Sequence, residues 1–119
     1  MNILVVEDNE ERIKWFQRRF QKHTLVIVQT AQAAIEILAN NLNWDCVFLD
    51  HDLGGVDFSI NGFNEQTGTE VAKFIRDRGF KNQVVIHSMN IYGSESMKSI
   101  LQEAIVCPFS FLDQIIKGD

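Results

Sequence analysis

Five short runs of apolar residues, separated by segments with helical periodicity, constrain the fold of this 119-residue chain more than any other feature. Continuous apolar runs of this length are typical of strands that are buried on both faces of a parallel sheet. Several of the runs are rich in Val and Ile, which favour strands. The predicted strands are residues 3–6, 24–28, 46–49, 83–86 and 105–107.

The segments between these runs predict helices, because each pairs an apolar stripe with a capping residue. Residues 10–22 place Ile13, Phe16 and Phe20 at spacings of three and four, which puts them on one helix face. Thr67 and Glu70 match a capping box, and Gly79 suits the end of that helix. Asn9 is the predicted cap of the first helix, and Thr30 is the predicted cap of a second helix over residues 31–40. Ser94 is the predicted cap of the fourth helix, and Ser110 with Asp113 caps a short last helix.

Strands that alternate with helices five times predict an α/β fold with a single domain over residues 1–119. Right-handed crossovers place helices on both faces of the sheet. For five strands we expect the flavodoxin-like, doubly wound parallel sheet with strand order 2-1-3-4-5. In that order the first and third strands are neighbours, and ligands bind beyond the carboxyl ends of the strands.

Polar side chains follow three of the five predicted strands, at the ends where ligands bind in such sheets. They are Glu7 and Asp8 after the first strand, Asp50, His51 and Asp52 after the third, and His87, Ser88 and Asn90 after the fourth. A structural explanation exists for each, since Asp and Asn also form turns and cap helices. The coincidence of three such clusters at one edge favours a functional site.

The carboxylates of this edge predict a site for a divalent cation. Glu7, Asp8 and Asp50 converge between the first and third strands, and the strand period of two places Asp52 on the same side as Asp50. Oxygen ligands of this kind favour Mg²⁺ or Mn²⁺, and Zn²⁺ or Mn²⁺ is favoured over Mg²⁺ if His51 and His87 are ligands. With Ser88 as a hydroxyl donor, the cation would form a site for a phosphoryl group.

Composition narrows the other function classes. The net charge is -5, and the basic residues between positions 12 and 22 resemble one polar helix face, so we expect no nucleic-acid binding. We expect a cytoplasmic protein without signal peptide or membrane span, because no apolar run approaches the roughly 18 residues that a span needs. Cys46 and Cys107 lie in apolar runs and are predicted to be buried and reduced.

The glycine-rich segment 53–66 is predicted to be a long functional loop.

Residues 3–9, 47–50 and 84–88 resemble a CheY-like receiver domain of two-component signalling, and the resemblance covers essentially the whole chain. It implies that Glu7, Asp8 and Asp50 bind Mg²⁺, that Asp50 accepts a phosphoryl group from a histidine kinase, and that Ser88 moves toward the phosphate. The family also has a lysine-proline pair after the fifth strand. Here that pair reads Cys107-Pro108. A displaced lysine, Lys81 or Lys98, is the alternative source of that charge.

Two further signatures are similar to a receiver offshoot, the cyclic-phosphate-processing receiver domains. They are Asp50-His51-Asp52-Leu53 before the long segment and His87-Ser88-Met89-Asn90 after the fourth strand, with Thr67-Gly68 opening the third helix. The resemblance implies an enzyme that acts on cyclic phosphates. In such an enzyme His51 or His87 would be the general base or acid, and Ser88 and Asn90 would donate hydrogen bonds to developing charge.

Three classes of function therefore remain. The first is a metal-dependent phosphodiesterase or phosphatase that acts on a cyclic or terminal phosphate of a small molecule. Its catalytic residues would be Asp50, His51, His87, Ser88 and Asn90. The second is a stand-alone response regulator that a phosphodonor kinase phosphorylates on Asp50. The third is a binding module without metal affinity. In the structural alternative for the two histidines, His51 hydrogen-bonds its loop and His87 is a satisfied core residue.

Overall fold

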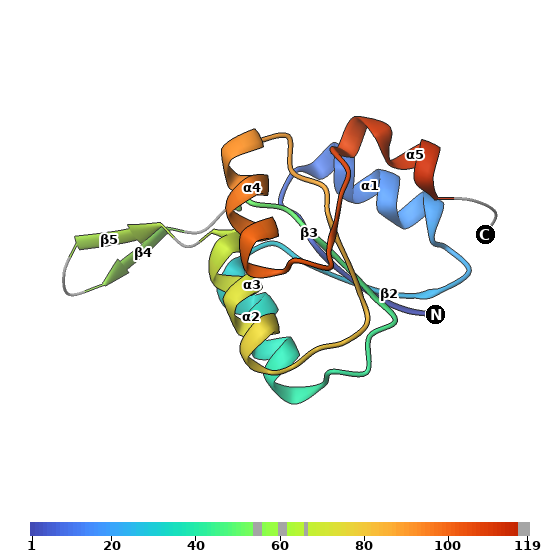
Figure 1. Cartoon of the computed structure of the whole chain (residues 1–119). Coiled ribbons are helices and arrows are strands. Elements are labelled where there is room, and N and C mark those ends of the chain that lie inside the picture. Colours follow the sequence, from blue (N-terminus) through green and yellow to red (C-terminus); the bar gives the residue numbers. More distant parts are fainter. Residues whose placement is uncertain (54–55, 60–61, 66, 117–119) are drawn as a thin grey trace.

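The computed structural model describes residues 1–53, 56–59, 62–65 and 67–116, and its centre is a five-stranded parallel sheet (Figure 1). The strands are β1 Asn2–Val6, β2 Thr24–Val28, β3 Cys46–Leu49, β6 Gln83–Ile86 and β7 Ile105–Val106. They lie in the order β2-β1-β3-β6-β7, and each neighbouring pair is parallel. Counted along the chain, this is the predicted flavodoxin-like order 2-1-3-4-5.

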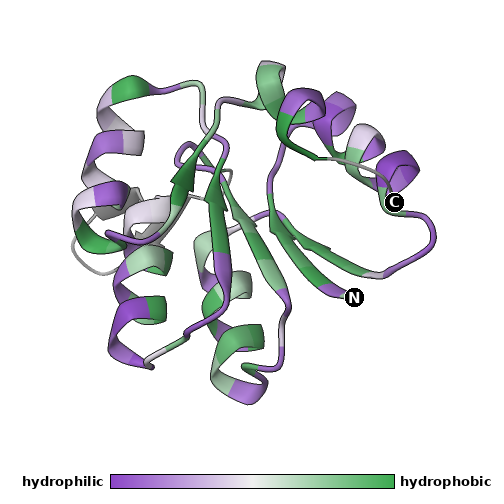
Figure 2. Cartoon of the chain, turned by 45° about the vertical axis from the view of Figure 1, so that its right-hand side comes forward, coloured by the Kyte–Doolittle hydropathy of each residue, from purple (hydrophilic) through white to green (hydrophobic). Residues whose placement is uncertain are grey.

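Five helices cover the two faces of the sheet, as Figure 1 shows. They are α1 Glu10–Arg19, α2 Ala31–Asn40, α3 Gly68–Asp77, α4 Ile91–Ile100 and α5 Leu112–Ile115, the last preceded by a 3-10 turn, Phe109–Phe111. Helices α1 and α5 lie together on one side of the sheet, and α2, α3 and α4 lie on the other (Figures 1 and 2). None of the helices in the described ranges is long and apolar enough to cross a membrane.

The strands of the sheet are coloured largely as hydrophobic in Figure 2, and each face of the sheet has its own core. Ile3 and Val5 point to the core beneath α1 and α5, while Leu4 and Val6 point to the core beneath α2, α3 and α4. All four are fully buried. The continuous apolar runs of the sequence therefore reflect burial on both sides, as expected for a parallel sheet.

Three predicted caps are present in the structure. The side chains of Asn9, Thr30 and Thr67 accept hydrogen bonds from the backbone N–H groups of the first turns of α1, α2 and α3. Gly79 follows α3 with φ of 70°, a conformation that glycine adopts without strain. Helix α1 ends at Arg19 rather than at residue 22, because Phe20 closes the helix and accepts a hydrogen bond from the His23 N–H.

Two other predicted caps were wrong. Helix α4 begins one turn earlier than predicted, and its cap is Asn90, whose Oδ1 accepts a hydrogen bond from the Gly93 N–H at 3.0 Å. Ser94 lies inside the helix and donates to the Ser88 carbonyl. Ser110 does not cap the last helix, because a 3-10 turn leads directly into α5 and places its hydroxyl beside the Met89 sulfur.

The segment predicted as a long loop contains an antiparallel hairpin, β4 Val56–Ser59 and β5 Gly62–Glu65. In Figure 1 it extends away from the body of the domain. The physical reason is visible in the sequence, since Val56, Phe58 and Phe63 alternate with polar residues at the strand period of two. Residues 54, 55, 60, 61 and 66 of the predicted loop lie outside the described residues.

Candidate functional site

A cleft of about 320 Å³ lies at the carboxyl ends of β1 and β3. These strands are neighbours, and their last residues, Val6 and Leu49, are paired in register. The residues that directly follow them are therefore brought to the same edge of the sheet. The cleft is lined by Glu7, Asp8, Asn9, Arg12, Asp50, Asp52, Leu53 and Met89. The four side chains predicted as metal ligands all belong to this lining.

Glu7 is fully buried, and its carboxylate has partners on both oxygens. Oε2 accepts hydrogen bonds from the backbone N–H groups of Asp8 and Asn9, each at 3.0 Å. Oε1 lies 3.0 Å from Nε2 of His87. Burial raises the pKa of Glu7, but the hydrogen bonds from His87 and the Asn9 N–H outweigh it and hold the pKa below its usual value. We therefore expect Glu7 to be ionised.

The pKa of Asp50 is shifted in the opposite direction to that of Glu7. Its Oδ1 accepts a hydrogen bond from the His51 N–H at 2.8 Å, and the residue is 3% exposed. Burial and the adjacent charge of Glu7 raise its pKa to about 6. With Glu7 ionised, Asp50 therefore keeps its proton below about pH 6 and adds a second buried negative charge above it.

His87 is the third member of a buried group in which one ligand atom each from Glu7, Asp50 and His87 lies within 4.8 Å of the others. The rings of Phe16, Phe48 and Phe109 surround its imidazole. Its Nδ1 is buried without a hydrogen-bond partner. His87 does not line the cleft. Its position behind Glu7 is that of a residue that orients a carboxylate.

His51, Asp52 and Asn90 form a second polar group at the rim. His51 Nδ1 lies 2.8 Å from Asp52 Oδ1, and the Asn90 amide donates to the same oxygen at 3.2 Å. The hydrogen bond from His51 is the main reason that the pKa of Asp52 lies below its usual value. Gly93 leaves room for the imidazole, since a Cβ there would lie 2.3 Å from His51 Cγ. Asp52 lines the cleft, whereas His51 and Asn90 contact Asp52 without being part of the lining. Residues that contact a lining carboxylate in this way are called the residues behind the cleft.

Ser88 is buried, and its Oγ accepts a hydrogen bond from the Asn90 N–H at 3.0 Å. It lines a separate hollow of about 270 Å³ together with residues of α4 and β7, not the carboxylate cleft. Four of the five predicted catalytic residues, His51, His87, Ser88 and Asn90, are therefore arranged around the cleft without lining it. Asp50 is the one that does.

Arg12 is a cleft residue that the sequence interpretation did not single out. Its Nη1 lies 3.7 Å from Glu7 Oε1 and 3.9 Å from Asp50 Oδ2. Its guanidinium lies over the ring of Phe109, 5.2 Å from the centroid. Arg12 follows the cap Asn9 by three residues, which places it in the first turn of α1. This spacing from the acidic pair was the signal that could have identified it.

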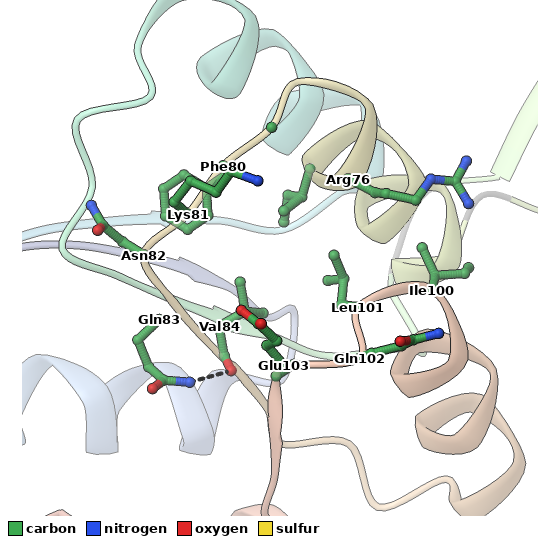
Figure 3. Close-up of a pocket in the computed structure, with 13 residues that line it drawn as sticks. Arg76, Phe80, Lys81, Asn82, Gln83, Val84, Ile100, Leu101, Gln102 and Glu103 are labelled. Atoms are coloured by element: carbon green, nitrogen blue, oxygen red, sulfur yellow. Dashed lines mark hydrogen bonds between the residues drawn. The ribbon is translucent and has the colours of Figure 1, made fainter.

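Neither lysine considered as a replacement reaches the cleft. The Lys98 ammonium donates to the carbonyl groups of Gln102 and Ala104 at the end of α4. Lys81 lines another hollow, of about 330 Å³, where β6 begins (Figure 3). That hollow lies at the opposite end of the strand from the acidic cleft. Cys107, at the position of the family's lysine, is buried, and burial raises the pKa of its thiol.

The residues of the cleft fit a divalent cation. Two buried carboxylates, Glu7 and Asp50, lie close enough to share one ion, and Asp8 and Asp52 add carboxylates to the same lining. Burial and, after it, the adjacent charge of Glu7 raise the pKa of Asp50, and a bound cation would relieve both effects. Oxygen donors of this kind match Mg²⁺ and Mn²⁺.

The fold and the acidic cleft define a receiver domain. Its structure is similar to that of the response regulator TrrA of Thermotoga maritima in complex with Mg²⁺-BeF, at 21% identity and a TM-score of 0.67, covering 97% of this chain and 94% of that one. It is also similar to the Mn²⁺-bound response regulator Rcp1 (19%, TM-score 0.66, 95% and 89%) and to the phosphorylated cyanobacterial phytochrome response regulator RcpA (22%, 0.67, 96% and 86%).

The model of the cyclic-phosphate processing receiver domain matches residues 2–103, and this chain belongs to that family. The comparison with curated proteins gave no match. The similarity to solved structures shows the receiver fold, and the sequence match shows the family. Both agree with the resemblance that the sequence motifs indicated.

Proposed function

We propose that this domain binds a divalent cation in the cleft of Glu7, Asp8, Asp50 and Asp52 and hydrolyses a cyclic phosphate. The observation that carries the proposal is the pair of buried carboxylates, Glu7 and Asp50, at the open edge of the sheet. Charges of one sign are costly to bury without a counter-charge. The family description adds the class of substrate.

The cation, when bound, supplies positive charge for the phosphate oxygens and acidifies water. Hydrolysis breaks one P–O bond of the ring and forms one to the oxygen of a water molecule, while a proton passes from the water to the leaving oxygen. In our proposal His51 acts through Asp52, because its Nδ1 lies 2.8 Å from Asp52 Oδ1 and thereby fixes that carboxylate at the cleft. Asn90 secures Asp52, and Ser88 secures the backbone of Asn90.

His87 acts through Glu7 in this proposal. Its Nε2 lies 3.0 Å from Glu7 Oε1 inside the core, so it fixes the carboxylate against the cleft. Groups that orient a metal-binding carboxylate commonly affect affinity as much as the chemistry itself. His87 is thus assigned a positioning role rather than direct contact with the substrate.

Phosphorus NMR tests the hydrolase directly. The protein with Mn²⁺ or Mg²⁺ is incubated with a panel of 2′,3′- and 3′,5′-cyclic nucleotides, alongside Asp50→Asn and the surface control Asp113→Asn. We expect a ring-opened phosphate with the native protein and the control, and none with Asp50→Asn. A flat time course for the native protein with metal bound contradicts hydrolysis of these substrates.

A second function, phosphorylation of Asp50 as a response regulator, is favoured by the position of its carboxylate at the end of β3 and beside the cleft. Acetyl phosphate with Mg²⁺ tests it, and intact-mass spectrometry detects the added phosphoryl group. A stable adduct that is absent from Asp50→Asn supports the regulator. Ring opening of a cyclic nucleotide without an adduct supports the hydrolase.

A further inference from the structure

We propose that Arg12 is a movable counter-ion of this cleft. It neutralises Glu7 and Asp50 while the cleft holds no metal, and it turns to the phosphate of a ligand once a divalent cation has taken its place. The inference rests on the proposed metal-dependent function and extends it. Receiver domains have a lysine after the last strand of the sheet, where this chain has Cys107. In our inference Arg12, on α1, supplies the positive charge that this cysteine cannot.

The contacts of Arg12 are those of a loosely held cation. Its Nη1 lies 3.7 Å from Glu7 and 3.9 Å from Asp50, beyond the 2.7–2.9 Å of a charge-assisted hydrogen bond. The side chain is 26% exposed, whereas the two carboxylates are buried. Phe109 supports one face of the guanidinium. A long side chain held in this way can turn without breaking a short hydrogen bond.

Arg12 and a divalent cation would compete for the same two carboxylates. A metal needs oxygen ligands at about 2.0–2.6 Å, and these are Glu7 and Asp50 in the proposed site. A guanidinium beside both oxygens repels a second cation at this position. Binding of the metal therefore requires the Arg12 guanidinium to move away from Glu7 and Asp50. It can move into the open cleft, which Arg12 already lines.

Among the described residues that line the cleft, no basic side chain other than Arg12 could bind a phosphate group. Lys98 is committed to two carbonyl groups at the end of α4, and Lys81 lies at the far end of β6. A guanidinium also matches the geometry of phosphate oxygens, because it can donate two parallel hydrogen bonds.

The test measures two affinities in each of four proteins: native, Arg12→Gln, Arg12→Lys and the control Arg18→Gln. Arg18 is exposed on the same helix, so its substitution changes the net charge equally. Mn²⁺ binding is measured by electron paramagnetic resonance without phosphate, and inorganic phosphate is then titrated into the metal-loaded proteins. Circular dichroism monitors folding, and Arg12→Lys keeps a cation at position 12.

We expect Arg12→Gln to bind Mn²⁺ roughly tenfold more tightly than the native protein and phosphate roughly tenfold more weakly, an opposition that general destabilisation cannot produce. Arg12→Lys should lie between them, and Arg18→Gln should match the native protein. Equal affinities in Arg12→Gln and Arg18→Gln overturn the inference and leave the proposed metal site standing. Weaker Mn²⁺ binding in Arg12→Gln also overturns it. Failure of both native protein and Arg12→Gln to bind Mn²⁺ overturns the inference together with the proposed function.

Discussion

Replacing Asp50 by asparagine should stabilise the metal-free protein at neutral and alkaline pH. In the unfolded chain this carboxyl ionises near its usual 3.8, whereas burial and the charge of Glu7 raise its pKa to about 6 in the folded protein. Between these values the folded state keeps a proton that the unfolded state has lost. The free energy of unfolding therefore falls as the pH rises from about 4 to about 6, and the loss is constant above that range.

The size of the effect follows from the shift. About two pKa units at 1.36 kcal/mol each amount to roughly 3 kcal/mol. Asp50 is 3% exposed, so solvent screening reduces this value little. Asparagine does not ionise, and its side-chain oxygen can still accept the hydrogen bond from the His51 N–H. The stabilisation should therefore grow from near zero at pH 4 to roughly 3 kcal/mol at pH 8.

Urea denaturation in the presence of a chelator measures this difference. With a slope of about 2 kcal/mol per molar urea, the midpoint of Asp50→Asn should exceed that of the native protein by about 1.5 M at pH 8. The exposed control Asp113→Asn should leave the midpoint nearly unchanged. Equal midpoints for native protein and Asp50→Asn at pH 8 would refute the reasoning that burial makes the ionised form of Asp50 unfavourable in the folded protein. A difference that stays the same from pH 4 to pH 8 would refute its electrostatic origin.

Three further substitutions test other contacts. Gly93→Ala should displace the His51 ring, since its Cβ would lie 2.3 Å from His51 Cγ. We expect the free energy of unfolding to fall by about 1–3 kcal/mol, seen as a lower melting temperature, and cyclic-phosphate turnover to be lost. His87→Leu leaves Glu7 Oε1 without its buried hydrogen bond and should cost roughly 1–3 kcal/mol in urea denaturation. Gly79→Ala meets no atom within 4 Å, so only the strain of its positive φ should appear, about 1 kcal/mol by the same assay.

The sheet could be predicted from the sequence because its central strands β1, β3 and β6 are buried on both faces, which leaves uninterrupted apolar runs such as residues 3–6. The start of α4 could not, because Ile91 and Tyr92 in its first turn are apolar and exposed. They break the amphipathic pattern from which a helix is recognised. The hairpin β4–β5 was missed because glycine and asparagine in the segment favour a loop.

The acidic cleft could be predicted because its carboxylates directly follow two paired strands, so sheet geometry alone brings them together. The placement of His87 depends on alternation beyond the end of β6. His87 shares a face with Val85 and points to the core beneath α1, where it meets Phe16. Arg12 was missed because it was read as part of a polar helix face, although its place in the first turn of α1, close to the acidic pair, was a usable signal.

The residues behind the cleft have a common relation to those that line it. His87 contacts Glu7, and His51 and Asn90 both contact Asp52. In these contacts a cleft carboxylate is held by a side chain that does not reach the cleft itself. Fixed carboxylates hold a cation in one geometry, at the expense of stability when the cation is absent. Substitution of a residue behind the cleft should therefore alter the geometry of metal binding, whereas substitution of a lining carboxylate should remove a ligand.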